Sequence, residues 1–243
     1  MKYYGGCDSG STYTKCVIVD ETGKMVADVT LRSRINAVLS CEESIEKAVA
    51  QVPDLNSAED LAYLVGTGYG RNKVPSADEN ISEISCHAMG VHVADPNVKA
   101  IIDIGGQDVK GIAIDADGTV LNFAMNDKCA AGTGRFFEAM AQCTVFAESE
   151  VISLVGEGKP MDEIAAGIEL SVAKRCFVMS KKAGAVDSIT LTGGCAKNDG
   201  LKEAIEKVLN LKVIDLPIDP QLMGALGAAE FARQKGMAKE GAV

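Results

Sequence analysis

The sequence predicts an α/β fold built from two similar lobes, each organised around a mixed β-sheet. Three observations predict this fold: strand and helix patterns alternate along the chain, one strand–turn–strand pattern occurs twice, and 47 % of the 243 residues are hydrophobic. That hydrophobic fraction supplies a sizeable core without disulfide crosslinks, and the length fits one large domain or two small ones.

The repeated pattern pairs residues 8–20 with residues 103–115 at a constant offset of 95 (103 − 8). The offset aligns identical residues: Gly10 with Gly105, Lys15 with Lys110, Asp20 with Asp115 and Gly23 with Gly118. Each copy is typical of a strand, a Gly-rich turn, a second strand, an Asp/Gly turn and a third strand. We therefore expect a first lobe of residues 1–95, joined by a C-terminal helix over 224–243, and a second lobe over 96–223.

Strands are expected where short β-prone runs are bounded by turn residues. The second strands of the two copies are expected over residues 16–19 and 111–114. The other expected strands are 61–65, 99–103, 188–192 and 211–215.

Helices are expected over residues 40–52, 81–93, 161–181 and 201–209, with a final small-residue helix opening at 224. Ser40 and Glu43 have the spacing of a capping box before an apolar face. Pro160 suits a first helical turn, and Asn198 or Asp199 can cap the helix at 201–209.

Charge and composition exclude several classes of partner. The chain has 24 Lys and Arg residues against 34 Asp and Glu residues, no Trp and 5 % aromatic residues. An acidic chain with few aromatic side chains for base stacking is a poor nucleic-acid binder. The sequence has no signal-peptide core and no apolar run of 18 residues, so we expect no membrane partner and a cytoplasmic location.

The eight cysteines include no pair at Cys-x-x-Cys spacing, which disfavours zinc-ribbon, thioredoxin-type and ferredoxin-type sites. Cys16, Cys86 and Cys176 lie in apolar-patterned segments, and we interpret them as buried hydrophobic residues. Cys129 and Cys143 each precede an apolar helical pattern, and a helix N-terminus favours the thiolate that metal ligation needs. A symmetric dimer would offer four such thiols, the Cys₄ set of a [4Fe-4S] cluster.

Gly-rich turns follow three of the expected strands, at residues 8–12, 103–107 and 191–198. In the first two, a carboxylate suited to hydrated Mg²⁺ is followed by glycines that let backbone N–H groups approach an anion. Ser11, Thr12 and Lys15 add hydrogen-bond donors or charge, and the glycines of the third turn can accommodate a flat nucleoside.

This set of turns resembles the acetate and sugar kinase/Hsp70/actin superfamily, whose two lobes have a ribonuclease H-like fold. The resemblance implies that ATP binds between the lobes. Asp8 and Asp103 would organise Mg²⁺, and Gln107 and Asp108 would lie where a water-polarising group belongs. The expected nucleotide-binding residues are Gly10, Ser11, Thr12, Lys15, Gly105, Gly106, Gly132, Gly134, Gly193, Gly194 and Lys197.

A more specific resemblance rests on residues 126–134, together with segments 5–15, 66–71, 103–108, 143–153 and 191–198. These segments resemble the ATP-dependent activators of 2-hydroxyacyl-CoA dehydratases and the related benzoyl-CoA reductase ATPase subunits, of the BadF/BadG/BcrA/BcrD type. The resemblance implies a homodimer that shares one [4Fe-4S] cluster held by Cys129 and Cys143 of each subunit. ATP hydrolysis would then drive a low-potential electron, supplied by a donor such as ferredoxin or flavodoxin, into a 2-hydroxyacyl-CoA dehydratase or a related reductase.

The spacing of 14 residues between Cys129 and Cys143 is shorter than the family pattern, so alternatives stay open. They are an ATPase subunit of a benzoyl-CoA-type or double-cubane-cluster reductase, a cluster-free small-molecule kinase of the same fold, and a nucleotide-gated binding protein. Cys176 and Cys195 would be the fallback cluster ligands.

His87 follows Glu83 by four residues within the helix expected over 81–93. We interpret His87 as a structural histidine rather than a metal ligand. Glu83 faces the same side of this helix and is a candidate to approach phosphate or water.

Overall fold

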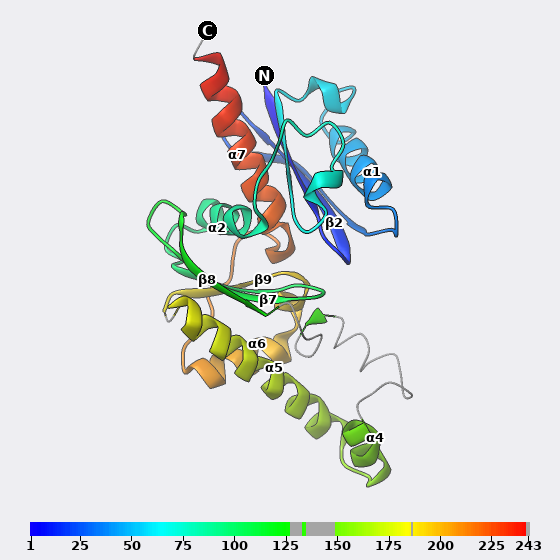
Figure 1. Ribbon diagram of the computed structural model, residues 1–243, viewed down its shortest axis with the longest axis vertical. Coiled ribbons are helices and arrows are strands. Elements are labelled where there is room, and N and C mark those ends of the chain that lie inside the picture. Colours follow the sequence, from blue (N-terminus) through cyan, green and yellow to red (C-terminus); the bar gives the residue numbers. More distant parts are fainter. Residues whose placement is uncertain (127–132, 135–148, 186, 242–243) are drawn as a thin grey trace. The chain divides into compact units, whose positions relative to one another are not determined.

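The computed structural model describes residues 1–126, 133–134, 149–185 and 187–241, and its chain divides into two units (Figure 1). The first unit comprises Met1–Pro96, Asp115–Val120 and Leu216–Val243, and the second comprises Asn97–Ile114 and Leu121–Asp215. Each unit contains a mixed β-sheet with helices packed on it, as the duplicated pattern predicts. In the part of the chain that is described, no helix is both long and apolar enough to cross a membrane.

The sheet of the first unit has the strand order β3-β2-β1-β4-β5. Strand β1 pairs antiparallel with β2 and parallel with β4, and β2 pairs antiparallel with β3. The strands are β1 Tyr3–Ser9, β2 Tyr13–Asp20, β3 Met25–Arg32, β4 Tyr63–Thr67 and β5 Glu79–Asn80.

The sheet of the second unit has the order β8-β7-β6-β9 and repeats the same pairing. Strand β6 pairs antiparallel with β7 and parallel with β9, as β1 does with β2 and β4. The strands are β6 Ala100–Ile104, β7 Val109–Ile114, β8 Val120–Asn126 and β9 Ile189–Thr192. The equivalent glycines Gly23 and Gly118 both adopt positive φ angles, of 85° and 75°, so the duplication predicted from the sequence extends to the turns.

Two helices cover opposite faces of the first sheet. Cys7 on β1 packs into a core with residues of α1 (Ala37–Val49), whereas the neighbouring Gly6 faces α7 (Met223–Glu240). A Cβ at Gly6 would lie 2.2 Å from the Ala225 carbonyl oxygen, so α7 lies directly on the sheet backbone. Because successive residues of a strand point to opposite faces, one strand serves both cores.

Helix α2 (Glu83–Ala94) packs closely against α7 within the first unit. A Cβ at Gly227 would lie 1.8 Å from the Cys86 carbonyl oxygen, and one at Gly90 would lie 1.9 Å from the Met223 carbonyl oxygen. The two helix backbones therefore touch at glycines, and any larger residue must separate the helices.

We expect Gly227→Ala to lower the free energy of unfolding by about 3 kcal/mol, because the added methyl group overpacks this backbone contact. Urea denaturation followed by circular dichroism measures the change. Gly167→Ala, in helix α5, is the matched control, because nothing lies within 4 Å of the Cβ that it adds. That control should stabilise the protein by about 0.5–1 kcal/mol, since alanine is the better helix former. Equal effects of the two substitutions would contradict the close helix contact.

Helices α5 (Met161–Ala183) and α6 (Asp199–Leu209) pack together and contribute to the hydrophobic core of the second unit. Helix α4 (Ser149–Gly156) precedes them. The backbone of β7 approaches α5 closely, because a Cβ at Gly111 would lie 2.7 Å from the Met179 carbonyl group. Helix α5 ends at Gly184, whose φ of 75° is the left-handed conformation that glycine favours at helix ends.

The cysteines interpreted as buried hydrophobic residues are buried. Cys16, Cys86 and Cys176 have no exposed surface, and burial raises the pKa of each thiol to about 12. Cys176 therefore lies in the core of the second unit, in agreement with its interpretation as a buried hydrophobic residue.

Two boundaries predicted for the first unit are wrong. Helix α1 begins at Ala37 and not at Ser40, because the Asn36 side chain caps it by accepting from the Val38 N–H. Ser40 lies inside the helix, where its hydroxyl accepts from the Arg34 N–H. The strand expected over 61–65 runs instead from Tyr63 to Thr67.

Other boundaries differ for similar reasons. Helix α2 begins at Glu83, two residues later than expected, because the Ser82 hydroxyl caps it by accepting from the Ser85 N–H. The strand expected over 211–215 is reduced to one parallel bridge between Thr190 and Ile214. The Asn198 cap of α6 is confirmed, since its side chain accepts from the Leu201 N–H at 2.9 Å.

Candidate nucleotide site

The first Gly-rich turn connects β1 to β2 in the first unit. It carries Gly10, Ser11 and Thr12, and the Ser33 hydroxyl holds it by donating to the Gly10 carbonyl at 2.8 Å. A Cβ at Gly10 would lie 2.5 Å from the Tyr13 carbonyl oxygen, so the turn requires glycine there. The turn is thus anchored from β3 and held in one shape.

Asp8 and Lys15 form an ion pair beside this turn. They are directly opposite each other in the β1–β2 ladder, and Lys15 Nζ lies 2.9 Å from Asp8 Oδ2. Asp8 is 2 % exposed, so the lysine compensates a carboxylate that has lost most of its water. The pair leaves a buried carboxylate at the end of a strand, next to the turn that is expected to bind phosphate.

Another turn of the first unit, at residues 66–71, packs against the same Asp8 carboxylate. A Cβ at Gly68 would lie 2.3 Å from Asp8 Oδ1, and one at Gly70 would lie 2.4 Å from the Ser9 hydroxyl. The Gly70 N–H donates to the Ser9 carbonyl at 2.9 Å. These two glycines were not predicted as site residues, although their Gly-x-Gly spacing indicates close backbone approach.

Thr12 has an unsatisfied hydroxyl. Its Oγ1 is buried and has no hydrogen-bond partner among the described residues. A buried polar atom without a partner is rare and costly, and a hydroxyl at a Gly-rich turn is suited to donate to an anion.

We expect Thr12→Val to weaken nucleotide binding roughly tenfold, the equivalent of one hydrogen bond to a charged group. The unfolding free energy should stay the same or rise, because valine matches threonine in shape and removes the unsatisfied hydroxyl. Calorimetric titration with ADP and urea denaturation measure the two effects separately. Wild-type ADP affinity in this variant would show that Thr12 does not touch the nucleotide.

The second Gly-rich turn, after β6 in the second unit, repeats the ion pair of the first. Lys110 Nζ lies 3.2 Å from Asp103 Oδ2 and 2.8 Å from Asp108 Oδ1. Asp103 and Lys110 are directly opposite each other in the β6–β7 ladder, and each is 2 % exposed. The offset that aligned Lys15 with Lys110 was therefore a signal for this pair, although Lys110 was not predicted as a site residue.

The other residues of this turn lie near its surface. Gly105 and Gly106 are half-buried, and the Gly105 N–H donates to the Asp108 carbonyl at 3.0 Å. Gln107 is exposed. Asp108 is held by Lys110, whereas Gln107 is open to a ligand or to water.

The third turn follows β9 and approaches the second. Gly193 has a φ of 82°, and a Cβ there would lie 2.4 Å from the Ile104 carbonyl oxygen. The Thr192 hydroxyl donates to Asp103 Oδ1 at 2.8 Å, so strands β6 and β9 are joined through this carboxylate. Gly194 and Lys197 are exposed and lie in the short helix Gly194–Lys197.

Gly134 is hydrogen-bonded to the second Gly-rich turn. The Gly134 N–H donates to the Gly105 carbonyl at 2.8 Å, and a Cβ at Gly134 would lie 3.5 Å from Cys195 Sγ. Cys129, Cys143 and Gly132 lie outside the described residues. Gly134, five residues after Cys129 in the sequence, therefore lies on the backbone of the turn that is expected to bind phosphate.

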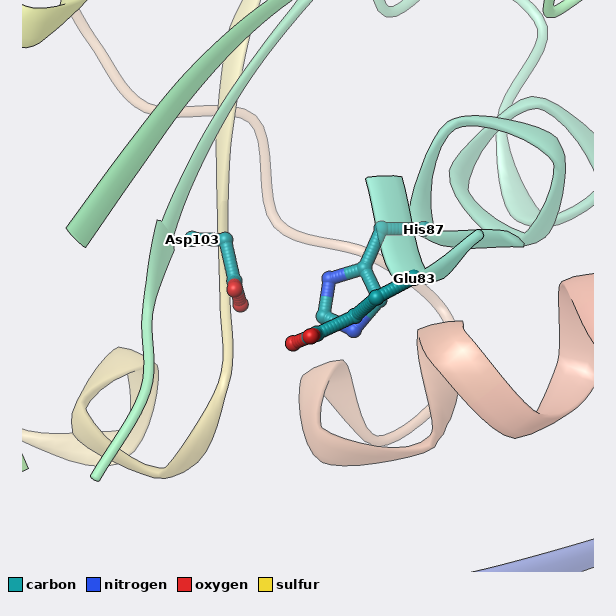
Figure 2. Close-up of side chains that lie close together, drawn as sticks. All are labelled: Glu83, His87 and Asp103. Carbon is teal, nitrogen blue, oxygen red and sulfur yellow. The ribbon is translucent and has the colours of Figure 1, made fainter. Parts of the chain in front are cut away.

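Helix α2 carries two further titratable side chains that the sequence singled out. Figure 2 shows Glu83 and His87 extending from this helix, and Asp103 at the end of β6 in the second unit. His87 is buried, at 5 % exposure, and Glu83 is half-buried. A Cβ at Gly224 would lie 2.7 Å from His87 Nε2 and 3.0 Å from Asp8 Oδ2.

The chain is similar to known proteins over most of its length. A family model described as the BadF/BadG/BcrA/BcrD ATPase family matches residues 6–143 and 140–232. The 2-hydroxyisocaproyl-CoA dehydratase activator of Clostridioides difficile is 41 % identical over 255 residues, which cover 95 % of this chain and 94 % of the relative. The (R)-2-hydroxyglutaryl-CoA dehydratase activating ATPase of Acidaminococcus fermentans is 41 % identical over 263 residues, covering 96 % and 98 %.

A solved structure shares the fold over almost the whole chain. The activator of the 2-hydroxyisocaproyl-CoA dehydratase from Clostridium difficile, with bound ADPNP, superposes with a TM-score of 0.89 at 39 % identity. The superposition covers 99 % of this chain and 98 % of that one.

Proposed function

Because the chain belongs to the BadF/BadG/BcrA/BcrD ATPase family, we propose that it hydrolyses ATP to deliver a low-potential electron to a 2-hydroxyacyl-CoA dehydratase. The observation that carries this proposal is the hydrogen bond from the Gly134 N–H to the Gly105 carbonyl. It connects the segment that contains Cys129 to a turn that is expected to bind phosphate.

The nucleotide roles follow from the chemistry of the turns. Asp8 and Asp103 are buried carboxylates, each held by a lysine, and they suit the water ligands of a Mg²⁺ ion. Glycine N–H groups of the first two turns and the Thr12 hydroxyl would bind the phosphates, and Gly193 and Gly194 would contact the nucleoside. Gln107 is exposed on the second turn, where it can orient a water molecule.

The donor set of the chain fits a shared iron–sulfur cluster. Cys16, Cys86 and Cys176 are buried in the cores, whereas Cys129 and Cys143 each precede an apolar helical pattern and are the ligands that we propose. Two such thiols per chain make four in a homodimer, which is the ligand set of a [4Fe-4S] cluster. When bound, this cluster supplies one-electron transfer at low potential.

We infer that the second Gly-rich turn couples ATP hydrolysis to electron transfer. Release of the γ-phosphate changes the contacts of the Gly105 and Gly106 backbone, and Gly134 is bonded directly to that backbone. A shift of the turn would therefore act on Gly134, which follows Cys129 by five residues in the sequence. A nucleotide can bias the electron-transfer site only if the protein around that site differs between nucleotide states.

The proposal places the protein in the cytoplasm, where reducing conditions keep its thiols free. Its partners there would be a second copy of the chain, the dehydratase, and a donor such as ferredoxin or flavodoxin.

Reconstitution tests this function. The protein, purified without oxygen, should activate 2-hydroxyisocaproyl-CoA dehydratase only when ATP and a low-potential reductant are both present. Iron analysis and the visible absorption spectrum should show a cluster that binds to the dimer. Activation without ATP, or an iron-free protein that phosphorylates a small molecule, would contradict the proposal.

A further inference from the structure

Two cysteine thiols meet in the core of the first unit. Cys7 lies on β1 and Cys41 on α1, and both side chains belong to one hydrophobic cluster and have no exposed surface. Their thiols are hydrogen-bonded to each other. Cys7 Sγ also lies 3.8 Å from Ser44 Oγ, and the Ser44 hydroxyl donates to the Cys41 carbonyl at 2.9 Å. The strand and the helix are therefore joined here through two neighbouring sulfur atoms.

This pair of thiols adjoins the first Gly-rich turn. Asp8 follows Cys7 directly on β1, and the Cys41 thiol is hydrogen-bonded to the side chain of Ser9. Asp8 and Ser9 are the last two residues of β1 before the turn, and each is 2 % exposed. Because a close-packed interior transmits small displacements, a change in the bonding of the two sulfur atoms reaches the turn.

The surroundings of the two thiols indicate which one reacts first, since the thiolate is the nucleophilic form of cysteine. The hydrogen bond from Cys7 lowers the pKa of the Cys41 thiol, and the hydrogen bond with Ser9 lowers it further, against the opposing effect of burial. Cys16 lies opposite Cys7 in the β1–β2 ladder, and burial raises the pKa of its thiol to about 12. Of these three cysteines, Cys41 therefore ionises most readily.

The position of Cys41 in its helix gives small molecules a route to the thiol. Cys41 lies four residues after Ala37, where α1 begins. Residues 34–36 and Leu39 are exposed. Because helices open more readily at their ends than in their middles, opening of the first turn of α1 uncovers Cys41 while the sheet stays folded.

We propose that Cys7 and Cys41 form a redox-modification site, at which a hydroperoxide oxidises the two thiols to a disulfide and thereby weakens nucleotide binding. With hydrogen peroxide, the Cys41 thiolate attacks the O–O bond, takes one oxygen as a sulfenic acid and releases one water molecule. The Cys7 thiol then attacks the Cys41 sulfur, so that the S–S bond forms, the S–O bond breaks and a second water molecule leaves. The two thiols lose two electrons and two protons, which reduce the peroxide to two water molecules.

The effect on the nucleotide rests on the proposed function, because it assumes that the first Gly-rich turn binds phosphate. An S–S bond is about 2.05 Å long, shorter than any contact between two thiols, so the disulfide draws Cys41 toward β1. The Cys41 sulfur moves away from Ser9 as a result, and the end of β1 shifts beside Asp8. The backbone of the turn then no longer has the shape of the reduced protein.

Peptide mapping after oxidation tests the site. The oxygen-free protein is treated with hydrogen peroxide, its remaining thiols are blocked with N-ethylmaleimide, and its peptides are analysed by mass spectrometry with and without dithiothreitol. The peptides that contain Cys7 and Cys41 should be joined, and dithiothreitol should separate them. Cys41→Ser should prevent this link. Cys16→Ala is the matched control, because it removes the thiol opposite Cys7 and should leave the link in place.

Calorimetric titration with ADP measures the consequence for the nucleotide. The oxidised wild-type protein should bind ADP roughly tenfold more weakly than the reduced protein, an effect equal to one lost hydrogen bond to a charged group, and dithiothreitol should restore the affinity. Cys41→Ser should bind ADP equally well before and after peroxide treatment. That variant keeps the other seven of the eight cysteines, so a loss of affinity that persists in it would come from oxidation elsewhere and would overturn the proposal.

Separate blocking of Cys7 and Cys41 after peroxide treatment, or a link between Cys7 and Cys16, would overturn the modification site. A Cys7–Cys41 link with unchanged ADP affinity would overturn its effect on the nucleotide. In each case ATP-dependent activation of the dehydratase by protein that was never oxidised would still support the proposed function. Failure of that activation would instead reject the proposed function, whatever the peptide map shows.

Discussion

Cys129→Ser is expected to abolish iron binding and electron delivery to the dehydratase while leaving nucleotide binding intact. A serine hydroxyl does not replace a thiolate ligand, and the symmetric dimer would lose two of its four ligands at once. The Gly-rich turns lie elsewhere in the chain and keep their ion pairs, so ADP affinity should stay at the wild-type value. Iron content, the visible spectrum, the ADP titration and the activation assay measure these effects in one preparation.

Cys176→Ala is the matched control for this loss. Cys176 belongs to the hydrophobic core of the second unit, where burial raises its thiol pKa to about 12. Its removal should leave the iron content unchanged. Loss of iron in the control, or full activation by Cys129→Ser, would show that the cluster is held by other residues.

Lys110→Met should lower the free energy of unfolding by about 3–5 kcal/mol, the range found when one partner of a buried ion pair is removed. The substitution takes the cation away from Asp103, which is 2 % exposed, and from Asp108. Nucleotide binding should weaken as well, because both carboxylates lie at the second turn. Urea denaturation followed by circular dichroism and titration with ADP check the two expectations.

Two further variants separate the buried charge from the loss of a lysine. The double variant Lys110→Met with Asp103→Asn removes the charge and its partner together, so it should recover part of the lost stability. Lys212→Met removes the cation of an exposed pair with Glu206, where Lys212 is 88 % exposed, and should change the unfolding midpoint little. A large effect of Lys212→Met, or none of Lys110→Met, would contradict the importance of burial.

Much of the fold could be predicted because it is repeated in the chain. The offset that aligns Lys15 with Lys110 predicted two equivalent strand–turn–strand units, and the structure pairs each lysine with the aspartate opposite it. Strand pairing through a short turn is local, so a few consecutive residues carry the information. Membership of the ATPase family, predicted from the motifs, is confirmed by the family match and by relatives at 41 % identity.

The errors occurred where two local signals competed. Asn36 and Ser40 can both cap a helix, and the structure uses Asn36 because Ser40 is buried at the β3 end of the helix, bonded to the Arg34 N–H. Residues 211–215 have a strand-like pattern, yet they form one bridge with β9 instead of a ladder. At the helix start the competing bonds are local, whereas the pairing of residues 211–215 depends on how they pack against β9.

The residues that surround Asp8 and Asp103 could be identified only from the folded structure. Gly68 and Gly224 are far from Asp8 in the sequence, and they approach its carboxylate because β4 and α7 pack against β1. His87 lies on the other side of Gly224 because α2 packs against α7. Gly134 and Gly193 reach the second turn in the same way. Residue types and short spacings therefore identify which groups can bind phosphate. Close approach between segments that are far apart depends on how helices and strands pack, and no local pattern records it.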